Sequence, residues 1–225
     1  MNRCAQCLEH FEEPITILNF YMKAEILCQR CRRKWKEMKI NFSNLQRCPR
    51  CLKRLSLDEE HCLDCQFLTR KFHLMDKLYC DNNYEGIVKE TIHQYKFLGD
   101  VALADVLAAQ IRLPNETFDF IVPIPSPFER DYQRTFNPVR EVLRAKKVNY
   151  TEMLSTIVRP KQSSLSKMVR AQAQNPFKCT TSLNIAGKSV LLVDDIYTTG
   201  LTVHHAASLL YIRKVRKLGV LTFAR

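Results

Sequence analysis

Eight of the ten cysteines in this chain form four Cys-x-x-Cys pairs, and no other feature of the sequence constrains the fold as strongly. Two thiolates three positions apart can bind one metal ion, and two such pairs complete the tetrahedral Cys4 ligands of a structural zinc site. The sequence therefore predicts about two zinc ions per chain and an N-terminal stretch that depends on metal to fold. The predicted ligands are Cys4, Cys7, Cys28, Cys31, Cys48, Cys51, Cys62 and Cys65.

The pairing of these cysteines is a separate question. Their order along the chain favours a sequential arrangement, in which the first two pairs bind one ion and the last two bind the other. A cross-braced arrangement, first pair with third and second with fourth, is the open alternative. Disulfides are less favoured because cytoplasmic thiols stay reduced. Cys80 and Cys179 lie outside the pairs and are predicted to be buried thiols.

The length and composition predict a cytoplasmic protein of one large and one small domain. The chain has 225 residues, 46% of them hydrophobic, which is enough for a sizeable core. Its apolar runs are shorter than the roughly 18 residues of a membrane span, and Met1 is not followed by a signal-peptide pattern. We therefore expect no direct membrane insertion.

The stretch VLLVDDIYTTGLTV, residues 190–203, predicts a ligand site. Its apolar residues suit a buried strand, and Asp194 and Asp195 follow at the carboxyl end, where open α/β sheets bind ligands. The chain then turns into an expected helix over 203–212, whose first N–H groups and nearby threonine hydroxyls would bind an anion. Carboxylates beside that anion can accept hydrogen bonds from sugar hydroxyls or bind Mg²⁺. The stretch therefore predicts a sugar-phosphate site.

Alternating apolar patterns after residue 66 predict an α/β sheet with helices on both faces. The first helix, over 84–97, carries Ile87, Thr91 and Tyr95 on one face. The predicted domains are a zinc module over 1–66 and an α/β domain over 67–225. The other expected elements are an edge strand within 67–83, helices over 101–111 and 128–146, and strands within 118–125, 153–159, 188–195 and 217–224.

The net charge of +12 favours an anionic partner. Between Gln29 and Arg54 there are ten basic residues against one acid, Glu37, and the only tryptophan, Trp35. One interpretation is that cations neutralise the phosphates of a single strand while Trp35 stacks a base. The other is a solvated charged face around a small zinc fold with Trp35 as its core. The candidate DNA-binding residues are Arg30, Arg32, Arg33, Lys34, Lys36, Arg50, Lys53 and Arg54.

The stretch VLLVDDIYTTGLT closely resembles the phosphoribosyl-pyrophosphate motif of type I phosphoribosyltransferases. The resemblance implies that Asp194 and Asp195 hold the ribose hydroxyls, with Mg²⁺ accompanying the ligand. It also implies a 5-phosphate loop that contains Thr198, Thr199, Gly200 and Thr202. The expected fold class is accordingly a type I phosphoribosyltransferase-like parallel sheet flanked by helices, with a small N-terminal Cys-rich zinc module.

Other stretches resemble the ComF (ComFC-like) proteins of bacterial natural competence, which join Cys-x-x-Cys modules to a phosphoribosyltransferase-like domain. They are YKFLGD (95–100), IVPIPSPFERDYQRTFNP (121–138), RPKQSSLSKMVRAQAQNPF (159–177) and LTFAR (221–225). The family usually reads Arg-Gly-Phe-Asn-Gln where this chain has Arg134-Thr135-Phe136-Asn137-Pro138, and Ala173 stands where an asparagine is expected. Both departures weaken the case for turnover. Candidates for the pyrophosphate side are Lys96, Arg134 and Arg170, which are otherwise plain surface cations.

The resemblance implies a competence accessory protein for the uptake or processing of single-stranded DNA. It would work with a ComFA-like helicase at the inner face of the membrane and retain a phosphoribosyl-pyrophosphate pocket. The alternative is an active phosphoribosyltransferase for nucleotide salvage or for an amine or base acceptor. A zinc-containing transcription regulator is a weaker alternative, because the sequence has no helix-turn-helix pattern. The zinc module is expected to dock the helicase or, alternatively, to cover an apolar face of the larger domain.

Overall fold

The computed structural model describes residues 2–13, 17, 21, 24–42, 46–56, 59, 62–157 and 174–225. The predicted role of Arg170 lies outside these residues. The helices of this part of the chain are α1 (Gln29–Glu37), α2 (Leu63–Thr69), α3 (Gly86–Phe97), α4 (Leu103–Gln110), α5 (Phe128–Arg134), α6 (Pro138–Ala145) and α8 (Leu201–Ile212). Its strands are β1 (Asn2–Arg3), β2 (His10–Phe11), β3 (Lys77–Tyr79), β4 (Phe120–Pro123), β5 (Leu154–Thr156), β6 (Phe177–Cys179), β7 (Ser189–Ile196) and β8 (Lys217–Ala224).

The centre of the fold is a parallel sheet with the strand order β3-β8-β7-β4. Strands β7 and β8 are its two inner strands, and β8 is buried along nearly its whole length. A parallel strand covered on both faces must be apolar on both sides, which is why these runs do not alternate with polar residues. The prediction of buried parallel strands here, with an edge strand within 67–83, is confirmed.

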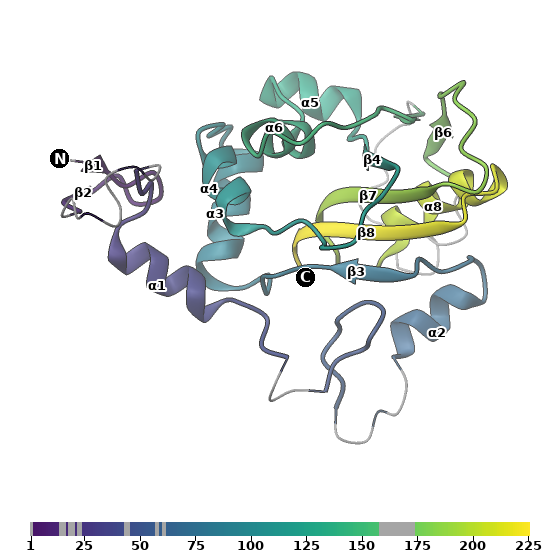
Figure 1. Ribbon diagram of the computed structural model, residues 1–225, viewed down its shortest axis with the longest axis horizontal. Helices are drawn as coiled ribbons and strands as arrows, with labels where there is room; N and C mark the ends of the chain where they lie inside the picture. The colour runs from purple at the N-terminus through teal and green to yellow at the C-terminus, as the bar shows by residue number, and fades with distance from the viewer. Residues whose placement is uncertain are drawn as a thin grey trace.

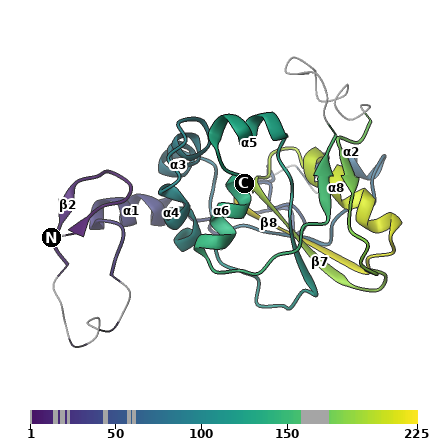
Figure 2. The same ribbon diagram turned by 90° about the horizontal axis from the view of Figure 1, so that it is seen from above.

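Alternate residues of β7 point into two different cores. Leu191 and Val193 pack with α3, α4 and α6 on one face of the sheet. Val190 and Leu192 pack on the other face with α8 and with the β5–β6 pair. Figures 1 and 2 show these helices on opposite sides of the sheet. The expected α/β arrangement, with helices on both faces, is confirmed.

The apolar face predicted for the first helix is confirmed in α3, where Ile87, Thr91 and Tyr95 are all buried. The Tyr95 hydroxyl donates a hydrogen bond of 2.7 Å to the carbonyl of Pro138. This bond ties α3 to the start of α6. It also helps to position the end of α3, where Lys96 lies.

Two element predictions need correction. A single helix over 128–146 is wrong, because Thr135 adopts a left-handed conformation (φ 67°) that ends α5. Pro138 then begins α6, and the extended Asn137 before it caps that helix by accepting a hydrogen bond of 3.0 Å from the Arg140 N–H. The strand expected within 153–159 does form, as β5, but it pairs antiparallel with β6 outside the main sheet.

The two cysteine-rich stretches contact different parts of the α/β fold. The first consists of β1, β2 and α1, and it lies at one end of the molecule beyond α3 (Figure 1). Trp35 of α1 is 1% exposed and packs in one core with Ile87 and Val88 of α3. A buried indole cannot stack a base, so that interpretation of Trp35 is wrong and its interpretation as a core residue is confirmed.

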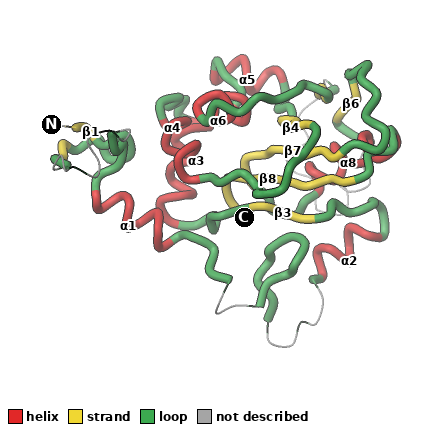
Figure 3. Tube along the Cα trace, in the orientation of Figure 1, coloured by secondary structure: helices red, strands yellow, loops and turns green. Residues whose placement is uncertain are grey.

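The second cysteine-rich stretch lies between α1 and α2 and is mostly loop (Figure 3). Cys48 and Cys51 share a core with Leu78 of the edge strand β3. The Leu78 N–H also donates a hydrogen bond of 2.8 Å to the Arg50 carbonyl. The predicted domain boundary at residue 66 falls inside α2 and stays a prediction.

Cys80 is buried, as predicted, whereas Cys179 is only half-buried, so the prediction for Cys179 is wrong. Within the described ranges, no helix combines the length and the apolar character that crossing a bilayer requires.

Candidate functional site

Two adjacent carboxylates lie at the carboxyl end of β7. The first five residues of this strand are buried and its last three are half-buried, because β4 ends at Pro123, opposite Val193. Asp194 and Asp195 therefore lie where the sheet opens. The backbone N–H of Asp195 donates a hydrogen bond of 2.9 Å to Oδ1 of Asp194, which orients the Asp194 side chain.

Lys96 at the end of α3 forms an ion pair with Oδ2 of Asp195. The two side chains are 17% and 18% exposed, so the pair is largely shielded from water. The lysine was predicted to face a pyrophosphate group, and the structure brings it to the acid pair. It neutralises one of two neighbouring negative charges.

The second charge is costly to keep. Burial and the neighbouring Asp195 raise the pKa of Asp194 to about 7, although Lys96 and the Asp195 N–H act in the opposite direction. A carboxyl group in this state gains from a cation or from hydrogen-bond donors that approach it. The site therefore favours a ligand with hydroxyl groups or with a bound divalent cation.

A cavity of about 580 Å³ opens beside the acid pair. It brings together five of the predicted site residues from four different elements: Lys96, Arg134, Asp194, Asp195 and Thr202. Its lining also contains apolar residues, among them Ile124, Pro125, Pro127, Ile157, Pro176 and Phe177. The cavity thus combines acids, cations and apolar side chains. Thr198, Thr199 and Gly200 are not among the residues that line it.

Those three residues belong to the turn that connects β7 to α8. Gly200 adopts a φ of 79°, and a Cβ atom there would lie 2.2 Å from Oη of Tyr197, so only glycine fits. Burial lowers the pKa of His204 to about 4, so the ring is neutral. Its Nδ1 lies 2.7 Å from the Gly200 carbonyl and, because a carbonyl oxygen only accepts, Nδ1 is the nitrogen that carries the proton. Gly200 precedes α8 and offers no capping side chain. Among the described residues no side chain caps α8, so its first N–H groups can bind an anion.

A polar network that sequence reasoning missed holds α5 at the cavity. The Asn137 amide donates hydrogen bonds to Oγ of Ser126 (2.9 Å) and to Oδ2 of Asp131 (2.8 Å). The Ser126 hydroxyl in turn donates a hydrogen bond to Oδ1 of Asp131. Every residue of α5 is exposed or half-buried, so this network and not apolar packing positions Arg134. The only available signal was that residues 126–137 are mostly polar.

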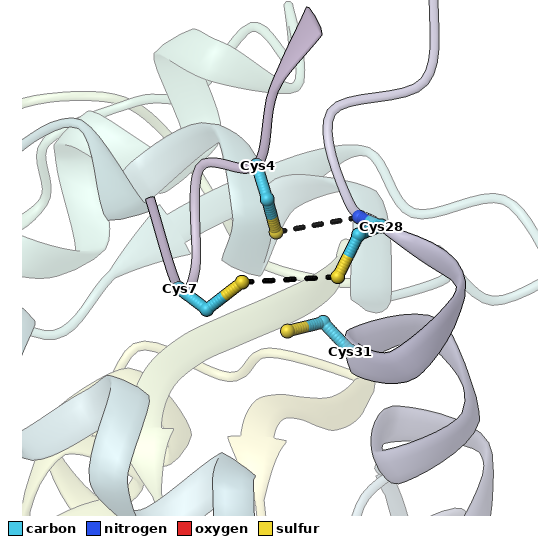
Figure 4. Close-up of side chains that lie close together, drawn as sticks. All are labelled: Cys4, Cys7, Cys28 and Cys31. Atoms are coloured by element: carbon cyan, nitrogen blue, oxygen red, sulfur yellow. Dashed lines mark hydrogen bonds between the residues drawn. The ribbon is translucent and has the colours of Figure 1, made fainter. Parts of the chain in front are cut away.

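The cysteines form two groups of four, and the grouping is sequential: Cys4, Cys7, Cys28 and Cys31 in one, and Cys48, Cys51, Cys62 and Cys65 in the other. The cross-braced alternative is wrong, and the ten cysteines are free of disulfides. In each group the candidate ligand atoms lie within 4.8 Å of one another. Figure 4 shows the first group, in which the Sγ atoms of Cys7 and Cys28 are 3.7 Å apart.

This geometry fits a tetrahedral metal ion. A metal–sulfur bond of about 2.3 Å implies sulfur–sulfur edges of about 3.8 Å, and the Cys48–Cys65 distance is 3.8 Å. Burial alone would raise the pKa of Cys4, but backbone hydrogen bonds, one of them from Cys28, lower it to about 7. The Cys65 thiol lowers the pKa of Cys51 to about 5. Burial raises the pKa of Cys31, and the hydrogen bond with Cys51 raises that of Cys65, so each group contains thiols of both kinds. A bound metal ion would favour the thiolate form of all four sulfurs.

The basic segment is less positive in space than in sequence. Acids from outside it pair with several of its residues, as in Arg30–Glu9 (2.7 Å), Arg32–Glu13 (3.3 Å) and Lys53–Asp64 (3.3 Å). Arg33 lies 3.9 Å from Glu37. Lys34, Lys36, Arg50 and Arg54 form no ion pair with an acid of the described residues, and all four are exposed.

Comparisons with known proteins assign the α/β part of the chain to a family and give relatives along most of its length. Residues 98–225 match the family described as "Phosphoribosyl transferase domain". The competence protein ComFC of Bacillus subtilis is 27% identical over 98% of this chain and 92% of its own length. The competence protein ComFC of Streptococcus pneumoniae is 30% identical over 73% of this chain and 74% of its own. A solved hypoxanthine-guanine phosphoribosyltransferase from Bacillus anthracis has 24% identity and a TM-score of 0.29, covering 54% of this chain and 63% of that chain.

The parallel sheet, with its acid pair at the end of β7, is a phosphoribosyl transferase domain. With the two cysteine groups in front of this domain and relatives that align along most of their length, the chain belongs to the ComFC family of competence proteins. The resemblance drawn from the sequence motifs is thereby confirmed.

The two cysteine groups generate a prediction about metal content. We expect about two zinc ions per chain, because each group offers four sulfur ligands. Cys48→Ser should leave about one ion per chain, whereas Cys179→Ser, outside both groups, should retain about two. Elemental analysis of the purified proteins measures this. One ion in the wild type, or an unchanged content in Cys48→Ser, would contradict the assignment.

Asp194 generates a prediction about pH. Its pKa of about 7 in the folded chain exceeds that of an unfolded aspartate, so the folded state binds the extra proton between about pH 4 and pH 7. The free energy of unfolding should therefore contain a part that falls as the pH rises through this range. Asp194→Asn removes it and should raise Tm more at pH 8 than at pH 5.

The control is Asp105→Asn, which replaces an exposed carboxylate of α4. It should change Tm little and equally at both pH values. If Asp194→Asn changes Tm by the same amount at pH 5 and at pH 8, Asp194 does not have the raised pKa, and the prediction is wrong.

Proposed function

We propose that the cavity beside Asp194 and Asp195 binds phosphoribosyl pyrophosphate together with Mg²⁺. The observation that carries this proposal is the acid pair at the carboxyl end of β7, facing a cavity that Thr202 of α8 also lines. In this assignment the carboxylates accept hydrogen bonds from the ribose hydroxyls. The turn formed by Thr198, Thr199 and Gly200, with the first N–H groups of α8, binds the 5-phosphate.

The cations have a separate role in this proposal. Lys96 lies next to Asp195, and Arg134 lines the same cavity from α5. Both would face the negative charge of the pyrophosphate group, which would then compete with Asp195 for the lysine ammonium. The divalent cation would add charge neutralisation between the pyrophosphate and the sugar. The Asn137 network matters here because it determines where Arg134 lies.

Calorimetry tests this site. The double variant Asp194→Asn/Asp195→Asn should lose Mg-dependent binding of phosphoribosyl pyrophosphate, because it removes both acceptors of the ribose hydroxyls. The matched control Glu90→Gln/Asp105→Asn also removes two carboxylates, both exposed on α3 and α4, and should bind like the wild type. A wild-type protein that binds no phosphoribosyl pyrophosphate would refute the proposal.

A second candidate function is transfer of the phosphoribosyl group to a base or an amine. The apolar residues in the cavity lining, such as Pro125, Ile157 and Phe177, favour it, because a planar acceptor could pack against apolar side chains near the acids. Charge stabilisation by Lys96 and Arg134 would assist departure of the pyrophosphate. Release of pyrophosphate on addition of bases or amines to the calorimetric samples distinguishes transfer from binding alone.

We propose further that the protein acts in the uptake or processing of single-stranded DNA in the cytoplasm, as the competence relatives suggest. In this proposal phosphate contacts are made by the cations of α1 and of the second cysteine-rich stretch that form no ion pair with a described acid. Lys34 and Lys36 are the clearest candidates, since both are exposed and form no ion pair with described acids. Trp35 contributes to the core and not to DNA contact.

Salt dependence tests the DNA contact. For single strands, each phosphate contact contributes about 0.7 to the slope of log K against log salt, so Lys34→Gln/Lys36→Gln should lower the slope by about 1.4. The control Lys89→Gln/Lys178→Gln removes two exposed lysines of α3 and β6 and should leave the slope unchanged. Equal slopes for both double variants would show that Lys34 and Lys36 do not contact the DNA.

The first cysteine-rich stretch, with β1, β2 and α1, is our candidate for docking a ComFA-like helicase at the inner face of the membrane. It lies at one end of the molecule (Figure 2), and its side chains Leu8 and Ile17 are 58% and 87% exposed. Exposed apolar side chains of this kind mark protein interaction sites. Deleting residues 1–66 would also remove Cys48 and Cys51 from the main core, so point substitutions are the better test.

Leu8→Asn/Ile17→Asn should abolish co-purification with the helicase, because both apolar contacts are lost. Asparagine tolerates the positive φ of residue 8, so the backbone can keep its conformation. Leu183→Asn, at another exposed position, is the control and should co-purify normally. Full recovery of the helicase with the double variant would exclude this surface.

A further inference from the structure

The second cysteine group contacts the turn between β7 and α8 from both of its ends. We call this turn, residues 197–201, the phosphate loop, in keeping with the function proposed for it. The contacts at its first end pass through Arg225 and Tyr197, and those at its second end pass through Leu201. Residues 51 and 225 are far apart in sequence, so nothing local in the chain predicts this arrangement.

Arg225 donates hydrogen bonds both to the cysteine group and to the phosphate loop. Its Nε donates a hydrogen bond of 2.7 Å to the Cys51 carbonyl. A terminal nitrogen of the same guanidinium donates to the carbonyls of Thr198 (3.2 Å) and Tyr197 (3.4 Å). Because a guanidinium is planar and rigid, these bonds hold the two segments at one separation.

Tyr197 is the buried residue against which the phosphate loop packs. It is 2% exposed and belongs to the same core as Cys48, Cys51 and Cys62. The Arg225 guanidinium lies 5.3 Å from the centre of its ring, within the range of a cation–π contact. Gly200 approaches its hydroxyl so closely that no side chain fits between them. A shift of Tyr197 would therefore move the loop.

The other end of the phosphate loop rests on α2, the helix that begins directly after Cys62. Leu201 packs with Leu68 and Leu74 in a small core, with half-buried Cys65 and Phe67 against it. The cysteine group thus determines the place of α2, and α2 supports the start of α8. Both ends of the loop depend on the same four cysteines.

We infer that the second cysteine group, when it holds its metal ion, positions the phosphate loop for ligand binding, and that Arg225 is the residue that transmits this. The inference rests on the proposed function of the loop. A loop ordered in the free protein has less conformational entropy to lose when a phosphate binds. The first cysteine group packs against α3 instead and serves as the internal comparison.

Hydrogen exchange on the full-length, metal-loaded protein tests this. The amides of Tyr197 and His204, bonded to Ala224 (3.0 Å) and Gly200 (2.9 Å), flank the loop and report on its opening. In Arg225→Gln both should exchange about tenfold faster, corresponding to the loss of about one net hydrogen bond, while the zinc content is unchanged. The control is Arg216→Gln, which loses a 3.2 Å hydrogen bond to the Gly187 carbonyl at the opposite end of the sheet. In this variant the amides of Tyr197 and His204 should exchange at the wild-type rate.

Removing an ion gives the second arm. Cys62→Ser should accelerate exchange at these two amides, and Cys4→Ser should not. Unchanged exchange in Arg225→Gln, or equal acceleration by both cysteine variants, would overturn the inference. Affinity for phosphoribosyl pyrophosphate should fall about tenfold in Arg225→Gln. If the wild type binds none, the proposed function fails, while the exchange rates of the free protein still decide the inference.

Discussion

The ion pair between Lys96 and Asp195 is the interaction on which the rest of the site depends. Two carboxylates in succession at the end of a buried strand repel each other, and burial makes both charges costly. Lys96 compensates one of them, and for this α3 must end close to β7. The packing of α3 against Trp35, the Tyr95 hydrogen bond to Pro138 and the position of α6 all contribute to that placement.

The two cysteine groups have unequal relations to this site. The first lies beyond α3 and supports the helix that carries Lys96, but at the far end from it. The second is continuous with the core below β3 and reaches the phosphate loop through Arg225. Both have little regular secondary structure, so we expect each to depend on metal coordination for a defined conformation. One group thus lies near the surface proposed for a partner, and the other contacts the loop proposed to bind phosphate.

Predictions from the sequence succeeded where the physical signal is local. The cysteine pairs, the acid pair after an apolar run and the buried face of α3 are each contained in fewer than twenty residues, and all three were predicted. The break at Thr135 was missed although Pro138 signalled it, because the apolar period continues on both sides. Trp35 was ambiguous because a basic neighbourhood is compatible with both a core and a binding surface. The contacts Lys96–Asp195 and Arg225–Cys51 join residues far apart in the sequence, so they depend on tertiary structure and no spacing rule predicts them.

The central claim is that the acid pair and the phosphate loop form one site for a phosphoribosyl group. A crystal structure of the protein with phosphoribosyl pyrophosphate and Mg²⁺ tests it most directly. The account predicts ribose hydroxyls within hydrogen-bonding distance of Asp194 and Asp195, the 5-phosphate against Thr198 to Thr202, and the pyrophosphate toward Lys96 and Arg134. A ligand bound away from the acid pair, or with its 5-phosphate against Lys96 and Arg134, would contradict it.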